Sequence, residues 1–429
     1  MGIRTMNTGR IFMIRQGLSL AGLSMVAAAA FGALPSGGAS AQVRGQMLRP
    51  DSSIEWPGDI GKRAHTNIEI FVPEGGYQAI TRFTPPFGGT LFGTPASVGC
   101  AYKLTATSTP ASGCNPNVVT ANPTGGARAI AIVDAFDDPT AAADLKAFST
   151  QFKLTAANFT KVPIGSPAPD AGWNLEESLD IEWAHAMAPN AKIFLVEATD
   201  ASFTNLLKAV AKANVLVAAA GGGEVSMSWG NGEFPTETSM DGNFKHPGVV
   251  YFASAGDSPG VEWPAASPFV VSVGGTGLSY NPNISNFQAE VIWQMTGGGP
   301  SQFYSRPHYQ NGVTGVTGPH RGTPDVAAVA DPSTGVWVYC SVATCQGFSP
   351  WWVVGGTSVA AQVWAGIVNS AGHFRSSTDA ELTAIYPAIG TAAFRDITSG
   401  SCGPFDGFLG LGGYDLCTGV GGPLGKTVK

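Results

Sequence analysis

Charge is scarce in this chain of 429 residues, since only 12% of them are Asp, Glu, Lys or Arg. The net charge is −7 and the Lys and Arg residues form no cluster, which argues against nucleic acid as a partner. There is no internal repeat, and beyond the first 41 residues no stretch is long and apolar enough to span a bilayer. With 57 Gly and 30 Pro, the composition is typical of a compact, loop-rich, exported protein and not of a disordered one.

Cysteine is also scarce, and its spacing is not that of a metal site. The six cysteines fall into three close pairs, which are Cys100 with Cys114, Cys340 with Cys345, and Cys402 with Cys417. No C-x-x-C motif and no matching His spacing is present, so a zinc site is the weaker interpretation. In an exported chain disulfides are plausible, and local pairing is the simplest of the 15 possible connectivities.

Residues 1–41 have the pattern of a cleaved signal peptide. Three arginines precede an apolar stretch at 18–34, and small residues at 39–41 offer an A-x-A cleavage site before Gln42. A membrane anchor is the alternative, but the apolar stretch is short and rich in Ala and Gly, which favours cleavage. We therefore expect export to the extracellular space or the periplasm, without a stable membrane anchor. We also expect a monomer.

The rest of the chain divides into two regions. Residues 42–128 are rich in Gly, Pro, Thr and Ser, and we interpret them as an irregular N-terminal extension that holds the first disulfide. From residue 129 to residue 429 apolar runs alternate with helical patterns. Strands are expected at 129–133, 193–196, 225–229, 249–254 and 269–273, and helices at 140–152, 173–189 and 203–213. This alternation predicts an α/β domain with a doubly wound, mostly parallel sheet and helices on both faces.

Ser358 lies where a nucleophilic serine would be placed. It follows the pair Gly355 and Gly356 and precedes a helical stretch of small residues. The glycines allow a sharp turn and the close approach of a substrate backbone. We expect Ser358 to cap the helix, where free N–H groups and the positive end of the helix dipole would stabilise an oxyanion. A helix cap without any chemistry is the alternative.

Three carboxylates are candidates to assist this serine. Glu176 and Asp180 are four residues apart and therefore share one face of the predicted helix. If both are buried, they hold a proton between them and the pKa of one rises, which suits a general base. An acidic, solvated first turn is the alternative. Asp257 follows the strand at 249–254, so we expect it at the carboxyl edge of the sheet, where active sites of such folds lie.

These features occur in an order that resembles the sedolisin family, the serine-carboxyl peptidases, which are acid-acting relatives of the subtilisins. The resemblance runs from about Ile130 to Leu424. It rests on five ordered motifs, each of them weak alone: IVDAFDDP at 132–139, Glu176 with Asp180, SMSWG at 226–230, SAGD at 254–257 and GGTS at 355–358. The resemblance implies a subtilisin-like fold.

The resemblance also implies roles for the four candidate residues. Ser358 is expected to be the nucleophile, Glu176 to accept its proton, and Asp180 to orient Glu176. Asp257 is expected in the oxyanion hole. A carboxylic acid donates a hydrogen bond there only while it is protonated, so the family's preference for acid has a physical basis.

The expected substrates are proteins or peptides, hydrolysed through an acyl-enzyme on Ser358. Ser228, Trp229 and Gly230 are expected to pair with the substrate backbone as an edge strand. The sequence does not choose between endopeptidase and tripeptidyl-peptidase activity. A catalytically silent exported homologue that acts as a binding protein is the alternative function. A conventional subtilisin is a further alternative, but it needs a His-Gly motif, which the sequence lacks.

The family carries a C-terminal calcium site, and this chain matches its residues. The carboxylates of Asp396 and Asp415, with the backbone carbonyls of Ile397, Leu411 and Gly413, would supply the hard oxygen ligands that Ca²⁺ prefers. Leu411 stands where the family usually has glycine. The alternative is that the two Asp residues only form turns.

The chain departs from the family pattern at two positions near the reacting residues. Gln362 stands where the family often has Pro, and Pro259 where it usually has Gly. Neither change removes a reacting group. Residues 42–128 do not resemble the long propeptide of family precursors, so the sequence leaves open how the chain is kept inactive during export.

Overall fold

The computed structural model describes residues 44–74, 90–105, 113–281, 284–342, 350–403 and 407–429. The expected signal peptide at 1–41 and the cysteine Cys345 lie outside these residues. Two of the expected disulfides are confirmed, Cys100–Cys114 and Cys402–Cys417. Within the described ranges, no helix is both long and apolar enough to cross a membrane.

The central sheet confirms the predicted fold class. Its strands lie in the order β12-β11-β9-β7-β4-β6-β5, and β15 also pairs with β11. Every pair is parallel except that of β11 with β12. The strands are β4 (Ala129–Ala135), β5 (Asn158–Pro163), β6 (Lys192–Ala198), β7 (Gly223–Met227), β9 (Val249–Ser254), β11 (Val271–Tyr280), β12 (Phe287–Ile292) and β15 (Val326–Val329).

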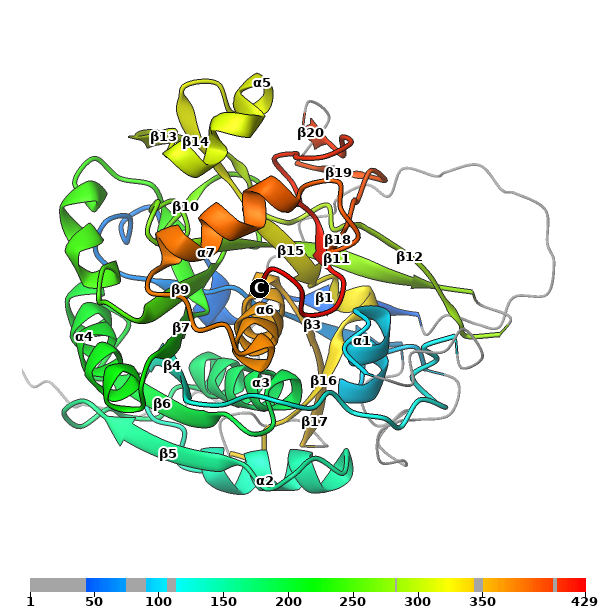
Figure 1. The fold of residues 1–429 in the computed structure, drawn as a ribbon. Helices are drawn as coiled ribbons and strands as arrows, with labels where there is room; N and C mark the ends of the chain where they lie inside the picture. Colours follow the sequence, from blue (N-terminus) through cyan, green and yellow to red (C-terminus); the bar gives the residue numbers. More distant parts are fainter. Residues whose placement is uncertain (1–43, 75–89, 106–112, 282–283, 343–349, 404–406) are drawn as a thin grey trace, which may run out of the picture. The chain divides into compact units, whose positions relative to one another are not determined.

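Helices cover both faces of this sheet. Successive residues of a strand point to opposite faces, and in the inner strands the residues on both faces are apolar. In β4, Ile130 and Ile132 join the apolar cluster that contains α2 (Ala141–Gln151), α3 (Ala171–Met187) and α6 (Thr357–Ala371). Ala131 and Val133 join the cluster that contains α4 (Phe203–Ala219). In Figure 1, α3 and α6 lie side by side, and α4 lies beyond the strands.

Two smaller sheets include strands from the N-terminal part of the chain. One has the order β1-β3-β17-β16 and the other β10-β8-β2. Their strands are β1 (Gly45–Leu48), β2 (His65–Thr66), β3 (Glu69–Pro73), β8 (Trp229–Gly232), β10 (Glu262–Trp263), β16 (Val336–Tyr339) and β17 (Trp351–Gly355). The sequence pattern did not predict β1 to β3, because each is too short to show a periodicity and they lie among Gly, Pro and Ser.

Further elements complete the described part of the chain. The helices are α1 (Pro95–Ala101), α5 (Thr314–Thr317) and α7 (Thr378–Ile385), with 3-10 helices η1 (Asp51–Ser53), η3 (Glu237–Phe244), η4 (His308–Val313), η5 (Pro332–Thr334) and η7 (Tyr386–Ala388). The short strands are β13 (Gly299–Ser305), β14 (His320–Thr323), β18 (Phe394–Arg395), β19 (Ser401–Cys402), β20 (Phe408–Leu409) and β21 (Gly422–Pro423).

Several predicted boundaries need correction. The helix expected at 203–213 continues to Ala219, and the strand expected at 225–229 is interrupted at Ser228, where β7 ends and β8 begins. Ser358 is not the cap of α6. Gly356 is the N-cap, and Ser358 is the second helical residue. Gly356 takes this place because its φ of 108° lies in a region that favours glycine.

A close contact between α3 and α6 brings the candidate residues of the two helices together. A Cβ atom on Gly366 of α6 would lie 2.5 Å from the Cβ of Met187 and 3.1 Å from the carbonyl oxygen of Ala184, both on α3. Glycine at 366 therefore sets how near α6, which carries Ser358, approaches α3, which carries Glu176 and Asp180. An added methyl group would push the helices apart.

We predict that Gly366→Ala destabilises the protein by about 1–3 kcal/mol, the usual effect of an overpacked contact. Alanine is the better helix former by roughly 0.5–1 kcal/mol, so a net loss would identify the helix contact as the cause. Urea unfolding measures it. Gly242→Ala is the matched control, since a Cβ there meets nothing within 4 Å. Equal stability of the two variants would contradict this interpretation.

Candidate active site

Ser358 lies at the start of α6 and is completely buried. Its hydroxyl donates to the carbonyl oxygen of Ser228 over 3.4 Å. Its backbone N–H, one of the free donors of the first helical turn, donates to the carbonyl oxygen of Asn67 over 3.2 Å. A Cβ on the preceding Gly356 would collide with this same carbonyl oxygen and would lie 2.5 Å from Asp257 Oδ2. Only glycine fits there.

Glu176 and Asp180 are both buried on α3, so the solvated alternative does not apply to them. Asp180 Oδ1 accepts from the hydroxyl of Ser228 over 2.9 Å, and Oδ2 accepts from Nε2 of Gln362 over 2.6 Å. Neither oxygen of Glu176 has a hydrogen-bond partner of good geometry among the described residues. Ser358 and Asp180 nevertheless lie near enough to Glu176 to interact with its carboxyl group.

Burial raises the pKa of both Glu176 and Asp180 well above the usual range. The negative charge of Asp134 raises both values further, while the interaction with Ser358 lowers the pKa of Glu176. Two carboxylates this close in a dry site do not both ionise at neutral pH, so the pair shares a proton.

One carboxyl oxygen of Asp257 accepts hydrogen bonds, and the other has no hydrogen-bond partner among the described residues. Oδ1 accepts from the backbone N–H of Thr357 over 2.7 Å and from its hydroxyl over 2.9 Å, whereas Oδ2 has no partner among the described residues. Burial raises the pKa of Asp257 to about 8, despite the two bonds from Thr357. Since Oδ1 is engaged as an acceptor, the proton belongs on Oδ2, where it is free to be donated.

Two residues contribute to this arrangement that the sequence did not assign to it. Asp134, at the end of β4, is fully buried, and burial together with Glu197 raises its pKa to about 8. It is the main charged neighbour of Glu176 and Asp180. Gln362 donates to Asp180 and also to the hydroxyl of Ser228, over 2.9 Å. The sequence contained one signal for the role of Gln362. This residue stands where the family often has Pro, and its side chain places an amide beside Asp180.

The expected substrate strand is not an edge in this structure. β8 lies between β10 and β2, so the chain's own residues His65 and Thr66 fill the position predicted for a substrate. The Trp229 side chain is buried, with Nε1 donating to the carbonyl oxygen of Val133 over 2.7 Å, which makes it a core residue. The Ser228 hydroxyl contacts Asp180 and so faces the candidate catalytic pair.

The residues of the expected calcium site gather around one turn. Asp396 accepts from the backbone N–H of Gly413 over 3.1 Å, and Asp415 accepts from that of Leu411 over 3.2 Å. Asp415 also accepts from the N–H groups of Cys417 and Thr418. Both carboxylates therefore reach the same turn, and their oxygen chemistry fits Ca²⁺. These backbone N–H groups already occupy some of the hydrogen-bond acceptor positions of each carboxylate.

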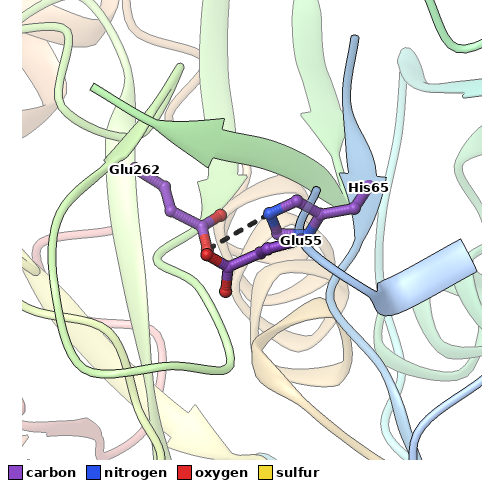
Figure 2. A group of neighbouring side chains, drawn as sticks. All are labelled: Glu55, His65 and Glu262. Carbon is purple, nitrogen blue, oxygen red and sulfur yellow. Dashed lines mark ion pairs between the residues drawn. The ribbon is translucent and has the colours of Figure 1, made fainter. Parts of the chain in front are cut away.

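A different cluster contains three possible cation ligands. Ligand atoms of Glu55, His65 and Glu262 lie within 4.8 Å of one another. Figure 2 shows the imidazole of His65 directed at the two carboxylates, with the ion pair to Glu262 drawn as a dashed line. None of these residues belongs to the expected calcium set.

Comparison with known proteins finds similar peptidases. The chain is 31% identical over 314 residues to kumamolisin of Bacillus sp. (strain MN-32), an alignment that covers 62% of this chain and 51% of that protein. It is 30% identical over 181 residues to sedolisin of Pseudomonas sp. (strain 101), covering 39% of this chain and 28% of that protein. These similarities support the sedolisin family for this chain. No family model matches it.

A solved structure supports the sedolisin-like fold. Pseudomonas sedolisin, a serine-carboxyl proteinase complexed with two molecules of pseudo-iodotyrostatin, matches with a TM-score of 0.62 and 23% identity, over 77% of this chain and 95% of that one. At this identity the match bears on the fold alone. The chain spans about half the length of kumamolisin and less of sedolisin.

We predict that the protein is more stable at pH 4 than at pH 8. A buried carboxyl group such as Asp134, with a folded pKa of about 8 against about 3.9 in an unfolded chain, keeps its full contribution below pH 4 and loses it as the pH rises toward 8. For each unit by which folding raises the pKa, the free energy of unfolding at low pH exceeds that at high pH by about 1.4 kcal/mol. Urea unfolding at a series of pH values, at constant ionic strength, measures the loss.

Asp134→Asn should reduce this loss, because an amide does not titrate. The matched control is Asp51→Asn, since Asp51 is exposed and its substitution should leave the pH dependence unchanged. A free energy of unfolding that stays level from pH 4 to pH 8 would show that the buried carboxyl groups are not held neutral.

Proposed function

We propose that the chain is an exported, acid-acting serine-carboxyl peptidase that hydrolyses peptide bonds in proteins or peptides. The observation that carries this proposal is the meeting of three groups at the start of α6: the hydroxyl of Ser358, the buried pair Glu176 and Asp180, and the acid form of Asp257. Each of them supplies one of the functions that acyl transfer needs, namely a nucleophile, a base and an oxyanion donor.

In the proposed reaction, Ser358 attacks the substrate carbonyl carbon while Glu176 takes the hydroxyl proton. Asp180, fixed by Ser228 and Gln362, orients Glu176. The oxyanion receives hydrogen bonds from the Ser358 N–H and from the acid proton of Asp257. Glu176 then gives its proton to the leaving amine, and water hydrolyses the ester in a second round of the same steps.

The electrostatics favour an acid optimum. Asp257 has a pKa of about 8 and is a donor throughout the acid range. Glu176 must ionise to act as a base, and the raised pKa described above belongs to a site from which water is excluded. When the site opens to a substrate and to water, the ionised form becomes easier to reach, since desolvation is the main cause of the raised value.

We predict peptide hydrolysis with an optimum below about pH 5, near carboxylic pKa values. Ser358→Ala and Glu176→Gln should each lose about 10⁴-fold or more in kcat, as for residues that act as one unit. A pH–rate profile on a denatured protein substrate measures both. Glu177→Gln is the matched control on the same helix, because Asn174 and not Ser358 is its partner.

Different outcomes separate this proposal from its alternative. An optimum near pH 8, or full activity in Ser358→Ala, would contradict the serine-carboxyl mechanism. A folded protein with no turnover at any pH would favour the silent homologue that acts as a binding protein. Damage by Glu177→Gln equal to that by Glu176→Gln would mean that the wrong face of α3 has been assigned.

We also propose that the sedolisin-like domain, residues 129–429, binds Ca²⁺ through Asp396 and Asp415 with the carbonyls of Ile397, Leu411 and Gly413. Support comes from the gathering of both carboxylates at the turn 411–413. The ion would tie this turn to the segment that the Cys402–Cys417 disulfide closes. We further propose that residues 1–41 are removed on export and that the protein is a monomer.

We predict that chelation with EDTA at pH 6 lowers the melting temperature and that added Ca²⁺ restores it, because an ion that binds only the folded state stabilises it by mass action. The effect should shrink at low pH as the carboxylates take up protons. Asp396→Asn should weaken the response. An unchanged melting temperature in EDTA at pH 6 would count against the site.

A further inference from the structure

Glu55, His65 and Glu262 bring one imidazole and two carboxylates together, and we call these three residues the His65 cluster. His65 lies on β2, Glu262 on β10, and Glu55 in the loop that follows η1. One ligand atom of each residue lies within 4.8 Å of the others. Figure 2 shows the imidazole directed at both carboxylates. Imidazole nitrogen and carboxylate oxygen are ligands that Zn²⁺ accepts in proteins.

The missing side chain of Gly230 lets two members of the cluster meet across a strand. β8 lies between β10 and β2, so Glu262 and His65 belong to the two outer strands of this sheet. His65 is paired with Gly230, and a Cβ atom on Gly230 would lie 2.3 Å from Glu262 Oε2. The carboxylate of Glu262 therefore occupies the space above Gly230 and reaches toward His65. A larger residue at position 230 would separate the two side chains.

The imidazole of His65 is held with one nitrogen directed into the cluster. Its side chain is only 5% exposed, and Nδ1 lies 3.1 Å from the carbonyl oxygen of Thr66. A carbonyl oxygen only accepts, so Nδ1 carries a proton and donates it. Nε2 has no hydrogen-bond partner in the part of the chain that the structure describes. In the neutral ring the lone pair of Nε2 then faces the carboxylates. A metal-binding histidine has this same arrangement, with its other nitrogen oriented by a carbonyl group.

The distance between His65 and Glu262 suits a shared cation better than a hydrogen bond. Nε2 lies 3.7 Å from Glu262 Oε1, which exceeds the roughly 3.2 Å limit of an N–H···O bond. Two ligands of one tetrahedral Zn²⁺, each about 2.1 Å from the ion, lie about 3.4 Å apart. Asn67 Nδ2 donates to Glu262 Oε2 over 3.1 Å, which leaves Oε1 for the side of His65. A small shift of the two side chains therefore accommodates the ion.

The charges of the cluster also favour a cation. Among the ion pairs of the described residues, Glu262 pairs only with His65, and Glu55 takes part in none. Arg49, another cation of the N-terminal part, pairs with Glu69 instead. With a neutral imidazole and both carboxylates ionised, the cluster carries two negative charges, which a divalent cation would neutralise. The nitrogen ligand favours Zn²⁺ over Ca²⁺ and Mg²⁺, because those two ions take oxygen ligands.

We propose that Glu55, His65 and Glu262 bind a divalent transition-metal ion of the Zn²⁺ kind, with water as the fourth ligand. Glu55 is exposed, so the ion has a route in from solvent. The ion would fasten the segment from η1 to β2 onto β10. This site shares no residue with the one proposed for Ca²⁺, and the inference does not depend on the proposed peptidase function.

Titration of the full chain with Zn²⁺ tests the proposal. The protein is treated with EDTA and then dialysed at pH 7 into buffer with excess Ca²⁺, so that any calcium site is filled. Neutral pH is chosen because metal ligands must be free of protons. Isothermal titration calorimetry should find one Zn²⁺ bound per chain, and the melting temperature should rise with added Zn²⁺. Mg²⁺ should produce neither effect.

Substitutions show whether the ion binds at the His65 cluster. Loss of a ligand should weaken binding at least as much as loss of a group that orients one, which is about 10–100-fold. We expect a loss of about 100-fold for His65→Gln and about tenfold for Glu55→Gln. Glu55 is exposed, so its variant should fold even if the change at buried His65 disturbs folding. His320→Gln and Glu74→Gln are the matched controls, because both residues are exposed and lie outside the cluster.

Three results would overturn the inference. No saturable binding of Zn²⁺ to the folded protein would mean that His65 and Glu262 form an ion pair and nothing more. Binding that both His65→Gln and Glu55→Gln leave unchanged would mean an adventitious ion only, held elsewhere on the chain. Equal binding of Mg²⁺ would refute the nitrogen ligand. None of these results involves Ser358, so each would leave the proposed peptidase function standing.

Discussion

Carboxyl groups buried in the candidate active site are the constraint on which the rest of the site depends. Asp134, Glu176, Asp180 and Asp257 are all at most 3% exposed, and burial is the main cause of each raised pKa. An ionised carboxylate in such surroundings is costly, so these groups keep protons and interact as neutral or shared-proton acids. The chemistry of the site is therefore the chemistry of acids held in a dry environment.

Holding these acids beside Ser358 requires a close approach of secondary structure elements at positions occupied by glycine. Gly366 lets α6 approach α3, and Gly356 leaves room for Asp257 and a neighbouring carbonyl group at the start of α6. Gln362 shows how one polar substitution fits into such a site, because its amide donates both to Asp180 and to Ser228. The two glycines set how closely the elements approach each other, and the amide of Gln362 donates a hydrogen bond to a carboxyl oxygen.

The sequence predicted the parts of this arrangement that depend on local pattern. The strands and helices that follow residue 129, the four-residue spacing of Glu176 and Asp180, and the Gly pair before Ser358 all appear in the printed chain. Their meeting in space followed from the fold that parallel strands with connecting helices adopt. The ordered motifs added the family, which no single pattern would have indicated.

Long-range contacts between short segments were not predictable in the same way. The pairings of β2 with β8 and of β3 with β17 join residues far apart in the chain through strands of two to five residues. Such pairings depend on backbone hydrogen bonds, which leave no periodic pattern. Asp134 as a neighbour of Glu176, and the amide of Gln362 beside Asp180, depend likewise on how distant elements pack.

The strand β1 has a further consequence for how the N-terminal part comes apart. All four of its residues are exposed although the strand is paired with β3, so backbone hydrogen bonds hold it and side-chain burial adds little. Residues 65–68, by contrast, are buried. Resistance to local opening should therefore increase along the segment from residue 45 toward residue 68. Fraying would therefore start at β1 and meet its largest barrier at the buried residues 65–68, while the central sheet stays intact.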